Sequence, residues 1–175
     1  NELRGTFPKE IALLSSLEIL DFDINIITGF LPTTLGEMTN LREMHVFDNY
    51  LTGTVPYELG EVTSLEAVNL QFNFLAQVLP ESLGRLGNLK EFLLDRNVFV
   101  GSLPTEFGQM SMLETFYVNL NALSGTLPTE FGDMSNLRDL RFDINSFSGT
   151  IPTEIGRWSK IVDLTFGNNT LTGTI

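Results

Sequence analysis

The residues with the chemistry for catalysis are 22 aspartates and glutamates and one histidine, His45, in a chain of 175 residues without cysteine. Two carboxylates can hydrolyse a glycosidic bond when different environments keep one protonated and the other ionised. Here many acids recur at equivalent positions of a repeat, which makes their environments similar. The chain has neither an HExxH metal motif nor a glycine-rich phosphate loop. We therefore predict that the chain is not an enzyme and needs no cofactor or metal.

An internal repeat of 24 residues positions these side chains. All seven prolines follow this spacing: Pro8, Pro32, Pro56, Pro80, Pro104, Pro128 and Pro152. Seven asparagines follow it as well: Asn25, Asn49, Asn73, Asn97, Asn121, Asn145 and Asn169. A fixed period of this length is typical of a solenoid, whose stacked coils share one continuous core. Residues 1–175 are predicted to form a single domain of about seven coils. Neither end has a polar cap, so we expect a longer array.

Each period has three zones. The first, LxxLxLxxN, is seen at residues 41–49, and its alternating apolar residues predict a strand with one buried face. The second, LxGxIP, is seen at 51–56 and predicts a short second strand. The third, at 130–137, has the spacing of a short helical turn or 3-10 segment. The asparagine after each first strand is predicted to join an internal ladder that satisfies backbone groups of adjacent coils.

The full period reads LxxLxxLxLxxNxLxGxIPxxLG, which resembles plant-type leucine-rich repeats along the whole chain. Residues 103–108, 127–132 and 151–156 are also similar to repeats from diatoms and related algae. The resemblance implies a right-handed, curved α/β solenoid with a parallel concave β-sheet, short second strands and 3-10 or helical turns on the convex side. It also implies an extracellular or cell-surface protein, because the family includes receptor-kinase ectodomains and secreted defence proteins. Such proteins bind a protein, peptide or glycan on the concave sheet.

The outward columns of the concave strands vary in chemistry, although packing does not require that variety. Nine carboxylates and two arginines give this face a formal charge of −7. Aromatic and arginine side chains often anchor interfaces. The predicted contact residues are His45, Phe47, Asp48, Gln71, Phe72, Asp95, Arg96, Tyr117, Asn119, Asp139, Arg141 and Asp143. We expect a non-catalytic recognition module, with solvation of an exposed strand face as the plainer alternative.

The net charge of −12 bears on the class of partner. Nucleic acids and anionic membranes are bound through lysine and arginine, which are outnumbered here. The charge favours a basic partner, and no apolar run is long enough to insert into a membrane.

Other patterns leave alternatives open. A structural component that assembles with other chains into a filament or wall is one, and an ice-binding solenoid is another. The second rests on a column of threonines after the glycine of each period: Thr6, Thr54, Thr126, Thr150 and Thr174, interrupted by Phe30 and Val78. Glu58, Glu106, Glu130 and Glu154 share one phase, which favours the first turn of a helical segment over a Ca²⁺ site. Asn168 begins a single N-glycosylation sequon.

Overall fold

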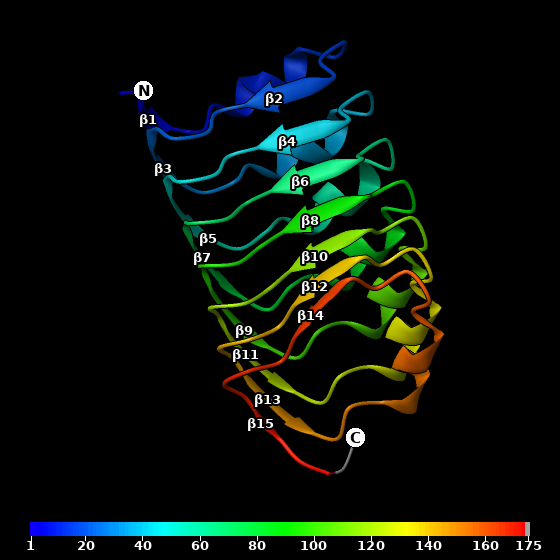
Figure 1. The fold of residues 1–175 in the computed structure, drawn as a ribbon. Helices are drawn as coiled ribbons and strands as arrows, with labels where there is room; N and C mark the ends of the chain where they lie inside the picture. The colour runs from blue at the N-terminus through cyan, green and yellow to red at the C-terminus, as the bar shows by residue number, and fades with distance from the viewer. Residues whose placement is uncertain (174–175) are drawn as a thin grey trace.

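The computed structural model describes residues 1–173, which wind into a curved stack of coils (Figure 1). Each coil contributes one strand to each of two parallel sheets and one 3-10 segment between them. The concave sheet consists of β2 (Ile19–Asp21), β4 (Glu43–His45), β6 (Ala67–Asn69), β8 (Glu91–Leu93), β10 (Thr115–Tyr117), β12 (Asp139–Arg141) and β14 (Asp163–Thr165). This is the solenoid architecture that the repeat predicts.

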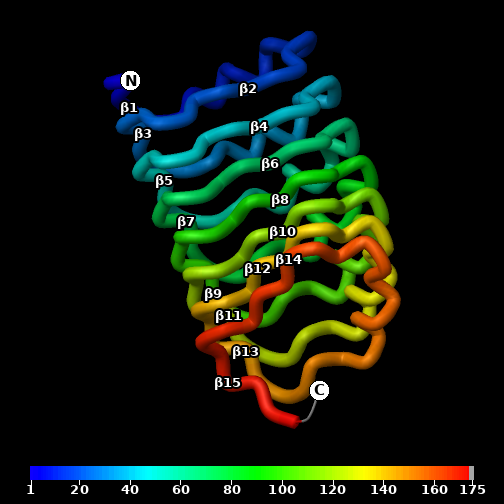
Figure 2. Tube along the Cα trace, viewed as in Figure 1, coloured from blue at the N-terminus to red at the C-terminus, as the bar shows by residue number. Residues whose placement is uncertain are grey.

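The second sheet, called the side sheet below, runs along the opposite edge of each coil. It consists of β1 (Arg4–Thr6), β3 (Ile26–Gly29), β5 (Tyr50–Gly53), β7 (Phe74–Gln77), β9 (Val98–Gly101), β11 (Ala122–Gly125), β13 (Ser146–Gly149) and β15 (Thr170–Leu171). Strands of the concave sheet pair residues one period apart, so Met44 lies beside Val68. The coils lie one over the next (Figure 2). Equivalent side chains therefore form columns that run along the stack.

The helical segments are all of the 3-10 type, and no α-helix occurs in residues 1–173. They are η1 (Lys9–Leu13), η2 (Thr33–Glu37), η3 (Tyr57–Glu61), η4 (Glu81–Arg85), η5 (Thr105–Gln109), η6 (Thr129–Asp133) and η7 (Thr153–Arg157). A proline in extended conformation precedes each one, as Pro104 does with φ −62°. Coils approach closely here, because a Cβ on Gly108 would lie 2.4 Å from the Glu130 carbonyl oxygen.

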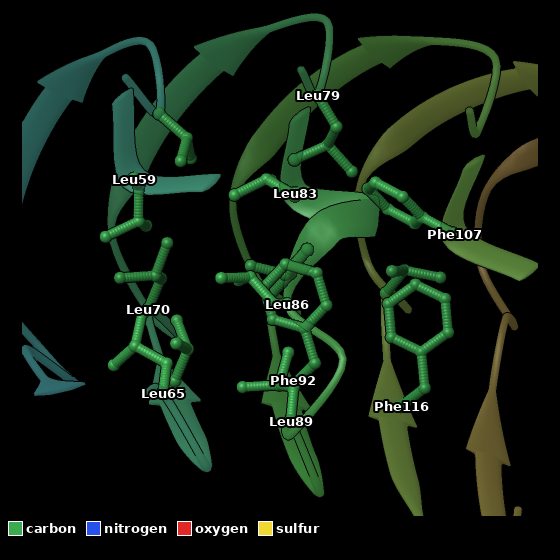
Figure 3. Close-up of a cluster of buried hydrophobic side chains, with 14 of the residues drawn as sticks. Leu59, Leu65, Leu70, Leu79, Leu83, Leu86, Leu89, Phe92, Phe107 and Phe116 are labelled. Atoms are coloured by element: carbon green, nitrogen blue, oxygen red, sulfur yellow. The ribbon is translucent and has the colours of Figure 1, made fainter. Parts of the chain in front are cut away.

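The core is continuous from coil to coil and lies between the two sheets and the 3-10 segments (Figure 3). Val46, Leu70 and Leu94 are fully buried, as the alternation of the first zone predicts. Full burial of such a side chain contributes roughly 1.5–3 kcal/mol. Phenylalanines fill the later coils, where the rings of Phe92 and Phe116 stack with centroids 5.6 Å apart.

The predicted inward positions are less buried in the outermost coils. Phe22 is half-buried and packs against the core. Leu164 in β14 is 37% exposed, because only β12 pairs with that strand. Burial of an inward side chain thus depends on neighbouring coils on both sides.

The chain turns after each concave strand, just before the ladder asparagine. The residue that precedes this asparagine has a left-handed backbone conformation. The φ angles there lie between 52° and 55°, at Ile24, Asp48, Phe72, Arg96, Leu120, Ile144 and Asn168. The left-handed region disfavours side chains with a Cβ, so each coil retains a strained position beside the concave face.

Candidate binding surface on the concave sheet

The ladder asparagines connect the two sheets at the end of every concave strand. Asn97 is buried; its Oδ1 accepts the Leu75 N–H of the side sheet at 3.0 Å. Its Nδ2 donates to the carbonyls of Leu70 and Leu94, at 2.9 and 3.1 Å. The Oδ1 atoms of the other six ladder asparagines also accept a backbone N–H: Asn25, Asn49, Asn73, Asn121, Asn145 and Asn169. The backbone that presents the outward columns is therefore held from coil to coil.

An aromatic cluster lies at the ends of the strands in the early coils. The Phe47 and Phe72 rings meet edge to face, with centroids 5.2 Å apart. The Arg96 guanidinium lies 4.6 Å from the centroid of the Phe72 ring. Phe72 is 39% exposed, and Asp48 beside it is exposed as well. These four residues, which we call the aromatic cluster, offer an apolar surface next to one cation and one carboxylate.

A polar cluster lies on the last three concave strands. Arg141 of β12 stacks on the Tyr117 ring of β10, with its guanidinium carbon 4.4 Å from the ring centroid. Arg141 also contacts Asp139 at 3.4 Å and Asp163 of β14 at 3.2 Å. The Tyr117 hydroxyl donates to Asp139. Burial, followed by this hydrogen bond and the charge of Asp139, raises the pKa of Tyr117 to about 12.

Beside this polar cluster is a shallow hollow of about 700 Å³. It is lined by Asn119, Arg141, Asp143, Asp163 and Thr165, among others. The Asp143 carboxylate accepts the Thr165 hydroxyl at 2.6 Å. The Oδ1 atom of Asn119 is buried without a hydrogen-bond partner among residues 1–173. Such an acceptor can be satisfied by an N–H or O–H group of a ligand.

Asp95 differs from the exposed contact residue that its outward position predicts. It is 5% exposed and accepts a hydrogen bond from the Gln71 side chain. Burial raises the pKa of Asp95, although the bond from Gln71 opposes the rise. Alternation identifies the face on which a side chain lies, but neighbours on that face can still cover it. Asp95 therefore presents less of its carboxylate than Asp139 or Asp143 does.

His45 lies on β4 with its Nε2 atom 3.3 Å from the Glu43 carboxylate. Among the described residues, no group of three or more His, Cys, Asp or Glu side chains is placed to hold a metal ion. The aligned glutamates Glu58, Glu106, Glu130 and Glu154 lie in the first turns of η3, η5, η6 and η7.

One feature that we did not identify from the sequence is an alternating charge ladder beside the concave sheet. Glu18, Arg42, Glu66 and Lys90 occupy one phase, and Arg42 and Lys90 both bond to Glu66. Arg138 bonds to Glu114 further along, at 3.0 Å. Sorting the charges by phase would have found it. These exposed pairs lie on the rim and contribute little stability each.

The threonine column lies on the side sheet, where Thr6, Thr54, Thr126 and Thr150 are exposed; Thr174 lies outside the described residues. Phe30 and Val78 project from the same column and are also exposed, which breaks its flatness. Asn168 is exposed and left-handed, while the hydroxyl of Thr170 in the same sequon donates to the Phe147 carbonyl.

The fold and the varied outward columns define a leucine-rich-repeat solenoid. It is similar to the ectodomain of the plant receptor kinase GASSHO1/SCHENGEN3 from Arabidopsis thaliana, with a TM-score of 0.99 and 36% identity over the whole chain. It is also similar to the plant peptide hormone receptor RGFR1, with a TM-score of 0.98 and 31% identity. The chain covers 21% and 28% of these two proteins. The chain is thus a leucine-rich-repeat protein of the plant type.

Other comparisons add less. A plant ice-binding protein matches with a TM-score of 0.74 and 23% identity, which shows the shared fold alone. No protein-family model and no curated protein matches the chain. Within the described residues, no helix has the length and apolar character to cross a membrane.

Proposed function

We propose that the chain is the non-catalytic ligand-binding part of a receptor-like protein, and that it binds an extended peptide along the concave sheet. The observation that carries the proposal is the pair of unlike clusters on one sheet, aromatic in the early coils and polar in the later ones. The similar receptor GASSHO1/SCHENGEN3 was crystallised in complex with CASPARIAN STRIP INTEGRITY FACTOR 2, and RGFR1 in complex with RGF2. The likeness supports an extracellular or cell-surface location.

The geometry suits a peptide that crosses the strands. Adjacent strands lie about 4.8 Å apart, so seven of them span roughly 29 Å. An extended chain covers about 3.3 Å per residue, so on the order of nine residues would reach from β2 to β14. Such a ligand can contact both clusters at once.

The charges suit a basic peptide with at least one apolar side chain. Asp143 and Asp163 line the hollow in the later coils, and Asp139 contacts Arg141, which also lines it. The unpaired Oδ1 of Asn119 can accept a backbone N–H of the peptide. The aromatic cluster can take an apolar side chain about four strands away. Charge at this face would steer the ligand and fix its direction along the sheet.

The test uses a displayed library of basic and neutral peptides panned against the whole chain. Enriched peptides are measured by fluorescence anisotropy against the wild type and a variant with Asp139→Asn, Asp143→Asn and Asp163→Asn. We expect binding to weaken at least about ten-fold, the loss of roughly 1.4 kcal/mol or more that several desolvated charge contacts supply. A matched variant removes the same charge elsewhere through Glu106→Gln, Glu130→Gln and Glu154→Gln, and should bind within about two-fold.

Failure to enrich any peptide, or an equal loss in both variants, would refute the proposed site. Enrichment of a glycan from an array, with the same dependence on the three aspartates, would keep the surface and replace the class of ligand.

The surface of the side sheet supports ice binding less well than the concave sheet supports peptide binding. The hydroxyls of Thr28 and Thr52 donate to glycine carbonyls of the preceding coil, so they already have partners. The threonines of the threonine column that the structure describes are exposed, but Phe30 and Val78 interrupt that column. Thermal hysteresis of the purified chain decides this point, because an ice-binding face lowers the freezing temperature without changing the melting temperature. We expect none.

A further inference from the structure

The side sheet has an outer face almost without charge, in a chain whose net charge is −12. Among all residues of its eight strands only Arg4, in β1, is charged. The residues that follow the glycine of each period are also uncharged. Among the helical segments and strands, each side strand contacts only its neighbours in the same sheet, so no other element of residues 1–173 covers the outer face (Figure 2).

Part of this face is an exposed apolar patch, which we call the side patch. Its members are 40% to 67% exposed: Phe30, Tyr50, Phe74, Val78, Val98 and Val100. They form one surface across β3, β5, β7 and β9. The rings of Tyr50 and Phe74 stack with centroids 6.0 Å apart. The Phe30 ring lies over Gly53 of the next coil, and the Val78 side chain lies over Gly101 of its own next coil.

The size of the side patch is close to that of a protein interface. From the exposed fractions, its surface is on the order of 600 Å². A standard interface buries about 800 Å² on each partner, so two such patches facing one another approach that size. Packing alone does not explain the patch, because the same columns hold Ala122, Ser124 and Ser146 in later coils of the same sheet.

We propose that the side patch is a homodimer interface, in which two copies of this chain meet side sheet to side sheet. Two molecules with a charge of −12 each repel one another, and like charges brought together at a contact cost free energy. On the side sheet, copies can meet without opposing carboxylates, because Arg4 is the only charged residue of its strands. A two-fold contact needs only this self-complementary patch from each copy. The concave sheets stay open, so the dimer presents two binding surfaces.

The test is sedimentation velocity of the whole chain from about 1 to 200 µM, since an interface of this size predicts association in the micromolar range. The disrupting variant is Tyr50→Ser with Phe74→Ser, which places in both coils the serine that Ser146 provides in the same column. We expect self-association to weaken at least about ten-fold. The matched variant, Phe47→Ser with Phe72→Ser, removes the aromatic pair beside the concave sheet and should change self-association less than about two-fold.

A second variant guards against loss of structure in the first. Val100→Glu adds one carboxylate to the β9 end of the side patch without removing an aromatic ring, and it should also weaken the dimer. Far-ultraviolet circular dichroism checks that each variant is folded. Added salt should strengthen the wild-type dimer, because it screens the repulsion between two acidic chains.

A wild type that stays monomeric at the highest concentration would overturn the proposal. So would a dimer that survives both side-patch variants, or one that the Phe47 and Phe72 variant disrupts instead. Peptide binding by the side-patch variants should equal that of the wild type, so this proposal and the proposed function can fail independently.

Discussion

The two sheets of this molecule come from one repeat, yet their outer faces have opposite chemistry. The concave sheet carries nine carboxylates and two arginines in and beside its strands, whereas Arg4 is the only charged residue in the side strands. Both sheets are parallel, and both bury their inner side chains in the same core. Backbone geometry therefore does not account for the difference. Under the two proposals above, the difference reflects what each outer face binds.

Each face retains groups that stability alone would not favour. On the concave sheet, burial raises the pKa values of Asp23 and Asp95, so both carboxylates are less stable as anions than they would be in water. On the side sheet, aromatic rings are exposed where serine and alanine also fit the coil. We interpret the first as preparation for a polar ligand and the second as preparation for an apolar one.

The largest predicted effect comes from removing a ladder asparagine, which connects the two sheets. Asn97→Ala leaves the buried Leu75 N–H of the side sheet without its acceptor. The Leu70 and Leu94 carbonyls each lose one of two asparagine donors, because Asn73 and Asn121 still donate to them. At about 1–3 kcal/mol for the unsatisfied N–H and about 0.5 kcal/mol for each weakened carbonyl, we expect the free energy of unfolding to fall by about 3 kcal/mol. Urea denaturation followed by circular dichroism measures it.

Asn88→Ala is the matched control for that change. The Asn88 side chain also donates to a backbone carbonyl, that of Thr63 at 2.9 Å, but on an exposed surface. We expect a loss below about 1 kcal/mol, because water replaces the bond. Equal losses in the two variants would mean that the ladder does not hold the sheets together.

A substitution with a smaller predicted effect on stability tests the backbone conformation of the side sheet apart from its exposed side chains. Gly101 has φ +79°, and a Cβ there would lie 2.8 Å from a methyl group of Val78. Gln77 has the equivalent place one coil earlier, with φ +72°. Gly101→Gln should therefore cost about 2 kcal/mol from left-handed strain and crowding.

The reverse change, Gln77→Gly, should gain about 0.5 kcal/mol, because relief of strain exceeds the added freedom of glycine in the unfolded chain. Thermal unfolding of both variants gives the two values. If Gln77→Gly destabilised the chain, the side chain of Gln77 would have a role in the side sheet that its backbone conformation does not show.

How much of this was predictable differs between the core and the surfaces. Pro8 to Pro152 and Asn25 to Asn169 establish the period, and the period predicts the coils, both sheets and the buried columns. Prediction works there because every coil meets the same packing demand. The outward columns meet no common demand, so their arrangement depends on particular neighbours. Burial of Asp95 beside Gln71 is one example, and the stack of Arg141 on Tyr117 is another.

The side patch was in principle visible from the sequence. Tyr50, Phe74 and Val98 share one phase, and the column around them contains no charge. The glycine and threonines of the second zone predict a strand, but they do not indicate which of its residues face water. Only the structure shows that the rings are exposed and that no other coil covers them.

The smallest predicted effect is the pH dependence of stability that Tyr117, in the polar cluster of the concave sheet, contributes. Its pKa of about 12 in the folded chain lies above the ordinary value of 10.0. The folded state therefore keeps this proton longer than the unfolded state does. Stability from this group is complete below pH 10 and is lost as the pH rises towards 12. The absorbance of phenolate, taken as the difference between the wild type and Tyr117→Phe, reports this titration alone.

Asp139→Asn tests the cause of that shift. The variant removes the negative charge beside the hydroxyl and keeps a group of the same shape, so the pKa of Tyr117 should fall part of the way towards 10. Burial is the largest cause and remains, so a full return is not expected. An unchanged titration would show that Tyr117 and Asp139 do not act together in solution. The polar cluster would then be a set of separate side chains, and the concave face would differ from the side sheet in charge alone.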